Sequence, residues 1–285
     1  MSNNLIEHIS EKIPEMSKGH KKISNYIIEN TDKAAFMTAA KLGEITGVSE
    51  STVVRYAMIL GFDGYPELLT ALREYIGSKL TSVQRMNVMN DRIGSSDVLE
   101  KIINMDIEKL RKTLETLSRD DFSAVVDNLC ASKTIYVIGA RSAAVLARYA
   151  AFYFNMMFEN VKLIHTTSTS EMFEQILNIG SDDLMIGMSF PRYSRLTVNA
   201  LRYAKDNGAK VVALTDSKSS PLCEYADNLL IAKNTLTTFA DSLIAPMSVL
   251  NALIAAVGMR KQDYVSDNFN RMEKIYEKYQ VFESK

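Results

Sequence analysis

Two short loops rich in arginine and serine have the composition of an anion-binding site. One reads G-A-R-S at residues 139–142, and the other reads S-F-P-R-Y-S-R at residues 189–195. Each follows a short apolar run and leads straight into a helical pattern, so the amides of a helix N-terminus would join guanidinium and hydroxyl groups around a phosphate ester. The predicted ligand-binding residues of these loops are Arg141, Ser142, Ser189, Arg192 and Ser194. In the alternative interpretation, the serines only cap the helices that follow them.

A second stretch, G-V-S-E-S-T-V-V-R-Y at residues 47–56, has the pattern of a helix that reads DNA. Ser49 is placed to cap this helix, and apolar residues recur at helical spacing along one face. The opposite face carries Ser51, Thr52 and Arg55, whose side chains can hydrogen-bond to base edges. Ser49 itself suits a phosphate contact, because the free amides at a helix N-terminus attract anions.

The residues before this helix predict a helix-turn-helix. Thr38 can cap a short first helix that turns Leu42 and Ile45 inward. Gly43 stands where the two helices would nearly touch, and Gly47 falls in the turn. The first eighty residues carry no excess of positive charge, so phosphate contacts need a local patch. The predicted members of that patch, which could also be ordinary solvated side chains, are Lys18, Lys22 and Lys41.

Residues 16–77 resemble the N-terminal domain of the RpiR family of bacterial transcriptional regulators. The resemblance is carried by G-V-S-E-S-T-V-V-R-Y followed by L-G-F-D-G-Y-P-E-L, which span two helices, the turn and the exit segment. It implies a regulator that binds a double-stranded DNA operator. We expect a single domain to bind weakly, so the protein should act as a homodimer or homotetramer.

Length and composition indicate a two-domain protein of the cytoplasm. The chain has 285 residues and a net charge of −1, and its start lacks a signal-peptide pattern. No apolar run is long enough to cross a membrane. Cys130 and Cys223 lie far apart in the sequence without metal-ligand spacing nearby. We therefore expect reduced thiols, no metal site and no cofactor.

After residue 132 the pattern changes to alternating strands and helices. Short apolar runs stand at residues 134–138, 161–164, 184–188, 210–214 and 228–231. They predict an α/β domain with a five-stranded parallel sheet, doubly wound in the flavodoxin-like order 2-1-3-4-5, behind the all-α helix-turn-helix domain. Both arginine-serine loops would then meet at the switch point, where such sheets bind ligands. The predicted division is a helix-turn-helix domain at 1–77, a hinge at 78–96 and the α/β domain with flanking helices at 97–285.

Residues 104–258 resemble a sugar isomerase (SIS) domain, the phosphosugar-binding partner of the helix-turn-helix in RpiR regulators. The match is clearest at A-L-R-Y-A-K-D-N-G-A-K-V-V-A-L-T-D-S-K-S-S-P-L. The resemblance implies that Ser142, Ser189 and Ser194 hold the phosphate of a sugar or amino sugar. Two motifs depart from the family pattern, since I-G-A-R-S replaces G-x-G-x-S and S-F-P-R-Y-S replaces S-x-S-G-x-T. In the second motif, Pro191 and Arg192 replace a serine and a glycine, so one hydroxyl and one close approach of the backbone to the ligand are lost. Arg141 and Arg192 would then substitute for them.

An apolar helix is predicted at residues 237–259, with Asp241 near its start. Its carboxylate would reach a ligand hydroxyl, or would simply lie near the helix cap. The alternative function is a sugar-phosphate isomerase that retains the helix-turn-helix, and such an enzyme needs a positioned acid or base. Of the three histidines only His165 lies in the second domain, and Glu171 is explained as a helix-start carboxylate. We therefore expect a regulator and not an enzyme.

Overall fold

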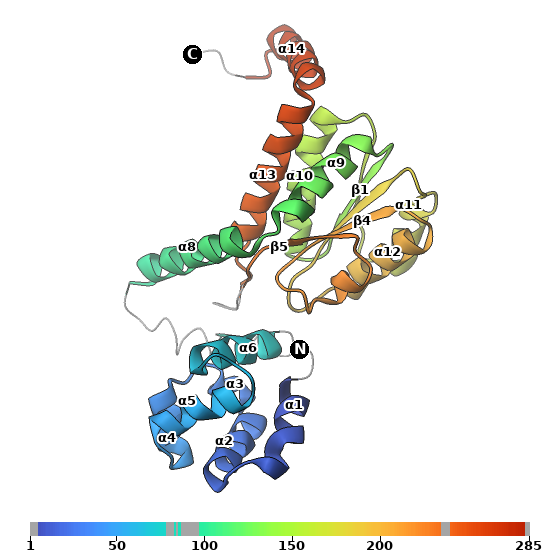
Figure 1. Ribbon diagram of the computed structural model, residues 1–285. Coiled ribbons are helices and arrows are strands. Elements are labelled where there is room, and N and C mark those ends of the chain that lie inside the picture. Colours follow the sequence, from blue (N-terminus) through green and yellow to red (C-terminus); the bar gives the residue numbers. More distant parts are fainter. Residues whose placement is uncertain (1–4, 78–82, 84, 87–96, 235–239, 283–285) are drawn as a thin grey trace. The chain divides into compact units, whose positions relative to one another are not determined.

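Contacts divide the chain into two units (Figure 1). The first unit comprises residues 1–105 and 235–241, and the second comprises residues 106–234 and 242–285. The computed structural model describes residues 5–77, 83, 85–86, 97–234 and 240–282. The predicted hinge at 78–96 therefore lies outside the described residues except at Val83, Arg85 and Met86. The predicted domain boundaries stay predictions.

The first unit is helical. Its elements are α1 (Leu5–Lys12), the 3₁₀ helix η2 (Ile13–Glu15), α2 (Lys18–Glu29), α3 (Thr31–Ala34), α4 (Ala39–Thr46), α5 (Glu50–Ile59) and α6 (Tyr65–Gly77). Their apolar faces enclose a core in which Ile23 and Tyr56 are fully buried. The predicted inward position of Ile45 is wrong, since 43% of its surface is exposed. α4 instead buries the face that holds Leu42 and Thr46, which lie one turn apart.

The second unit is built on a five-stranded parallel sheet in the order β2-β1-β3-β4-β5, which confirms the predicted topology. The strands are β1 (Ile135–Gly139), β2 (Val161–Ile164), β3 (Leu184–Met188), β4 (Lys210–Thr215) and β5 (Asn228–Ile231). β1 and β3 are buried along their whole length. This burial is typical of central parallel strands that are covered on both faces, and it explains their unbroken apolar runs.

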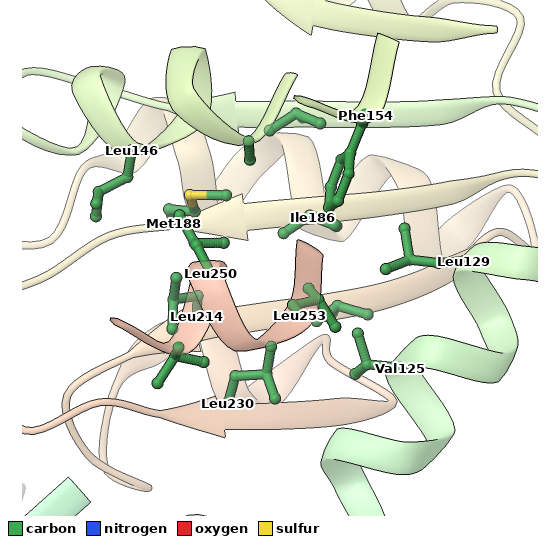
Figure 2. Close-up of a cluster of buried hydrophobic side chains, with 14 of the residues drawn as sticks. Val125, Leu129, Leu146, Phe154, Ile186, Met188, Leu214, Leu230, Leu250 and Leu253 are labelled. Carbon is green, nitrogen blue, oxygen red and sulfur yellow. The ribbon is translucent and has the colours of Figure 1, made fainter. Parts of the chain in front are cut away.

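Helices cover both faces of the sheet (Figure 1). One face shares a core with α9 (Arg119–Ala131), α10 (Ala143–Met157) and α13 (Ile244–Arg260). Figure 2 shows part of this core, including Phe154 of α10, Ile186 of β3 and Leu253 of α13. The other face packs against α11 (Thr169–Ile176), α12 (Arg195–Asp206) and the 3₁₀ helix η3 (Pro221–Glu224). The two layers of helices leave the strand ends to carry the loops.

The remaining helices are α8 (Val98–Thr116) and α14 (Gln262–Tyr279). α13 begins at Ile244 and not at residue 237 as predicted; residues 240–243 are not helical, and residues 235–239 lie outside the described part. Pro246 explains the late start, because a proline is tolerated in the first turn of a helix but not in its interior. Among the described residues, no helix combines the length and the hydropathy that crossing a bilayer requires.

Candidate functional sites

The exposed face of α5 carries the residues predicted to read DNA. The Ser49 hydroxyl accepts the Thr52 amide at 3.3 Å, so Ser49 caps the helix as predicted. The same hydroxyl lies 2.9 Å from the Ser51 hydroxyl and 2.8 Å from that of Thr52. Ser51 and Arg55 are exposed, and Arg55 Nε donates to the Ser51 carbonyl at 3.3 Å. The structure therefore brings the four predicted residues together on one polar surface.

Two glycines fix the angle at which α5 leaves α4. Gly47 adopts φ +68° at the end of α4, a left-handed conformation that favours glycine. A methyl group added at Gly43 would lie 2.8 Å from the Val48 carbonyl oxygen, so only glycine allows this approach of the two backbones. The Thr38 hydroxyl accepts the Lys41 amide at 3.2 Å and begins α4 as predicted. The local sequence thus builds the predicted helix-turn-helix.

The start of α2 lies beside the start of α5, and Lys22 of α2 lies near the turn before α5. A methyl group added at Gly19 would lie 3.7 Å from Thr52 Cγ2, and one added at Gly47 would lie 3.9 Å from Lys22 Nζ. Lys18 opens α2 and is exposed. Lys22 therefore lies beside the turn that precedes α5, whereas a basic patch that includes Lys18 stays a prediction. Lys41 differs, because it forms an ion pair with Glu44 at 2.9 Å.

Three residues around α5 were not predicted from the sequence. His20 of α2 lies 5.9 Å from the Tyr56 ring, and its pKa is lowered by burial and by the neighbouring Arg55 guanidinium. At the other end of α5, Lys12 Nζ donates to the Ile59 carbonyl at 2.8 Å, and His8 Nε2 lies 3.2 Å from the Leu60 carbonyl oxygen. α1 therefore satisfies carbonyl groups that a helix end leaves unpaired. Periodicity within a helix gives no signal for such contacts between helices.

The loop after β1 begins at a close approach of strand and helix. A methyl group added at Gly139 would clash with the Ala143 carbonyl in the first turn of α10, so glycine is required there. Arg141 adopts φ +57°, and both Arg141 and Ser142 are exposed. Ser142 stands at the N-cap position of α10, but its side chain makes no capping hydrogen bond. These two side chains are thus presented at the carboxyl end of β1, as predicted.

The loop after β3 starts directly beside the loop after β1, because Gly139 and Met188 are partners at the ends of neighbouring strands. Ser189 is only 3% exposed, and its hydroxyl accepts the Ser194 amide at 2.9 Å. Arg192 is exposed between them, and the Ser194 side chain makes no capping hydrogen bond to α12. Ser189 therefore holds the loop in shape, while Arg192 and Ser194 stand where an anion could reach them.

Asp241 lies apart from these strand-end loops in the chain. It precedes α13 in a non-helical segment, and its carboxylate pairs with Arg85 at 3.1 Å. The neighbouring Ser242 hydroxyl donates to Asp106 of α8 at 2.7 Å. The role of Asp241 at a ligand stays a prediction. Across the described part of the chain, no group of three or more His, Cys, Asp or Glu side chains could hold a metal ion.

Comparison with known proteins assigns families to both regions. The helix-turn-helix domain of the rpiR family matches residues 3–79, and the SIS domain matches residues 128–256. The HTH-type transcriptional regulator HexR of Pseudomonas aeruginosa is 27% identical over 265 residues, which cover 90% of this chain and 90% of that protein.

Two of the similar solved structures are RpiR-type and NanR proteins. The sugar isomerase domain of an RpiR transcription factor from Sphaerobacter thermophilus is 27% identical with a TM-score of 0.58, covering 61% of this chain and 97% of that chain. The NanR protein of Vibrio vulnificus, solved in complex with ManNAc-6P, is 20% identical with a TM-score of 0.61, covering 99% of this chain and 100% of that one. The second similarity shows a shared fold. The predicted family and fold class are both confirmed.

Proposed function

Because this chain belongs to the rpiR family of helix-turn-helix regulators, we propose that it is a bacterial transcriptional regulator whose operator binding is controlled by a phosphorylated sugar or amino sugar. It acts in the cytoplasm, without catalysing a reaction. The observation that carries the proposal is the exposed face of α5, where Ser49, Ser51 and Arg55 form one polar surface on a capped helix. Such a helix can enter the major groove with its first two turns at the base edges.

The effector is proposed to bind at the carboxyl ends of β1 and β3. Their loops start side by side and expose Arg141 and Arg192, which suit the charge and shape of a phosphate. Ser142 and Ser194 add their hydroxyls, and the helices that they precede, α10 and α12, add backbone amides at their N-termini. That NanR, with the same fold, was solved with ManNAc-6P supports a phosphorylated sugar as the class of ligand.

Control of DNA binding is proposed to require two or more copies of the chain. Large apolar side chains are exposed on the second unit, with Phe152 of α10 at 59% and Met259 of α13 at 80%. Exposed apolar groups of this size are typical of surfaces that bind another protein chain. In a homodimer or homotetramer, effector binding would change the spacing of paired recognition helices, which must match half-sites about 34 Å apart or a multiple of that distance.

A thermal-shift experiment tests the ligand site. Phosphorylated sugars, with ManNAc-6P among them, should raise the melting temperature of the wild type, because a ligand at one hundred times its dissociation constant stabilises the folded state by about 2.7 kcal/mol. The unphosphorylated sugars lack the charge that the arginines bind and should not raise it. Arg192→Ala should abolish the shift and leave ligand-free DNA binding intact. The matched control is Arg202→Ala, an exposed arginine on α12 whose partner is Asp206. A full shift in Arg192→Ala would reject this loop as the site.

The isomerase alternative rests on polar groups near the end of β2. His165 Nε2 lies 3.1 Å from Arg148 Nη2, and the Thr166 hydroxyl hydrogen-bonds to the Glu171 carboxylate. An isomerase would need one of these groups as its acid or base. Incubation of the pure protein with the sugar phosphates of the thermal-shift panel distinguishes the two functions. A product formed above background and abolished by Glu171→Gln would favour the enzyme.

A further inference from the structure

The loop after β3 is tied to the end of β4 by polar groups that the proposed site does not use. The Tyr193 hydroxyl donates to the Asp216 carboxylate at 2.9 Å. Thr215 Oγ1 donates to the Ser189 carbonyl at 2.8 Å. Within the loop, the Ser194 amide donates to the Ser189 hydroxyl at 2.9 Å. Residues at the end of β4 therefore bind the loop at Ser189 and at Tyr193, and a hydrogen bond between Ser194 and Ser189 joins the two ends of the loop.

These tethers are buried. Thr215 is fully buried, Ser189 is 3% exposed and Asp216 is 9% exposed. A buried polar group without a hydrogen bond costs free energy, so each of these bonds is expensive to break. Burial raises the pKa of the Tyr193 hydroxyl, and the Asp216 charge raises it further. Both effects favour the protonated hydroxyl, which is the form that donates to Asp216.

These hydrogen bonds restrict the loop segment that carries Arg192. Arg192 directly precedes the anchored Tyr193, and its own side chain is exposed at the carboxyl edge of the sheet. β3 and β4 are paired in register up to Met188 and Leu214, so the loop and its anchors leave neighbouring strand ends. A segment fixed on both sides of a charged residue loses less conformational entropy when that residue binds a ligand.

We propose that Tyr193 and Asp216 are positioning residues for the anion site: their hydrogen bond holds the loop that carries Arg192 and Ser194 in its binding conformation before the ligand arrives. This inference deepens the proposed function and rests on it. The arrangement also places a carboxylate near the loop, and the Tyr193 hydroxyl donates to it at 2.9 Å.

Amide hydrogen exchange of the ligand-free protein tests the role of the pair. Tyr193→Phe removes only the hydroxyl, and exchange of the Ser194 amide should become about tenfold faster, as expected when one hydrogen bond to a charged acceptor is lost. The matched control is Tyr203→Phe on α12, whose hydroxyl donates to the Leu177 carbonyl at 3.3 Å. It should leave Ser194 exchange unchanged. Asp216→Asn keeps an oxygen that accepts the tyrosine hydroxyl, and it should retain most of the protection.

Two results would overturn the inference. Exchange of the Ser194 amide at the wild-type rate in Tyr193→Phe would show that the bond does not order the loop. Equal acceleration of Ser194 exchange in Tyr193→Phe and in the control Tyr203→Phe would show that the effect does not depend on the bond to Asp216.

Inorganic phosphate is the probe for binding, followed through the same amide signals. Tyr193→Phe should bind it about tenfold more weakly than wild type, whereas Tyr203→Phe should bind it equally well. Equal phosphate affinity in Tyr193→Phe and wild type would contradict a positioning role. Failure of the wild type to bind phosphate would instead reject the proposed site, and the ligand-free exchange rates would still decide whether Tyr193 orders the loop.

Discussion

Replacement of Gly43 by alanine should destabilise the helix-turn-helix, although alanine is the better helix former. In the middle of α4, alanine would by propensity alone add about 1 kcal/mol of stability. The new methyl group, however, would lie 2.8 Å from the Val48 carbonyl oxygen and 3.4 Å from the Glu50 nitrogen. Both are backbone atoms, and the Val48 amide is itself bonded to the Gly43 carbonyl at 2.9 Å.

Relief of this contact requires α4 and α5 to move apart by several tenths of an ångström. Overpacking of this kind costs about 1–3 kcal/mol. Since the propensity gain offsets part of that cost, we expect a net loss of about 1 kcal/mol in the free energy of local unfolding. The same movement displaces the reading face of α5, so affinity for operator DNA should fall as well.

Native-state hydrogen exchange at buried amides of α5 measures this local stability in the full chain, which has no tryptophan to report unfolding by fluorescence. The control is Gly19→Ala in α2, where the nearest atom to the new methyl group would be Val48 Cγ1 at 3.4 Å, the end of a side chain. That variant should be as stable as wild type or slightly more stable. Exchange in Gly43→Ala as slow as in wild type would refute the close approach of the two backbones.

Three further predictions concern single charges. Arg55→Ala should weaken specific operator binding by about 1–3 kcal/mol, with Arg202→Ala unchanged, and an unaltered affinity would reject Arg55 as a base reader. The pKa of His20 is lowered by burial and by Arg55, so protonation of His20 favours unfolding. The free energy of unfolding, measured with urea, should be constant above pH 6.5 and should fall below that pH. His20→Gln should lose this dependence on pH. Burial raises the pKa of Asp227, but the hydrogen bonds from Lys205 and from the Val211 amide together outweigh burial, so the pKa is lowered. The ionised Asp227 should therefore stabilise the fold above pH 3.8, and this stabilisation should be lost as the pH falls further. Asp227→Asn should cost about 1 kcal/mol of unfolding free energy at pH 7, measured by urea titration. A variant that kept the wild-type dependence of stability on acid would contradict this prediction.

Most of the α/β fold could be predicted from the sequence, because buried parallel strands appear as unbroken apolar runs. The runs at 161–164, 184–188 and 228–231 are β2, β3 and β5 residue for residue. Their alternation with helical patterns and the right-handed rule of crossovers left few possible strand orders. The sequence also predicted the turn of the helix-turn-helix, because Gly43, Gly47 and Ser49 each have a local backbone reason to stand there.

What could not be predicted depends on contacts between segments distant in sequence. Ile45 lies on a helix of eight residues, and periodicity over so short a span does not decide which apolar residue faces the core. The Tyr193–Asp216 hydrogen bond joins residues 23 positions apart through the pairing of β3 and β4. The contact of Lys12 with the end of α5 spans 47 positions. Only the late start of α13 had a local signal, since Pro246 excludes a helix that begins at residue 237.

The central claim is that a phosphorylated sugar at the sheet edge controls DNA binding by α5. The most direct test isolates genomic DNA fragments with the full-length protein and measures their affinity by fluorescence anisotropy at fixed salt, with and without each sugar phosphate. We predict that one sugar phosphate changes the affinity by about tenfold or more, a coupling free energy of about 1.4 kcal/mol, and that Arg192→Ala loses this change while it still binds the DNA. Equal affinities with and without every sugar phosphate, or no selective binding of any fragment, would contradict the claim.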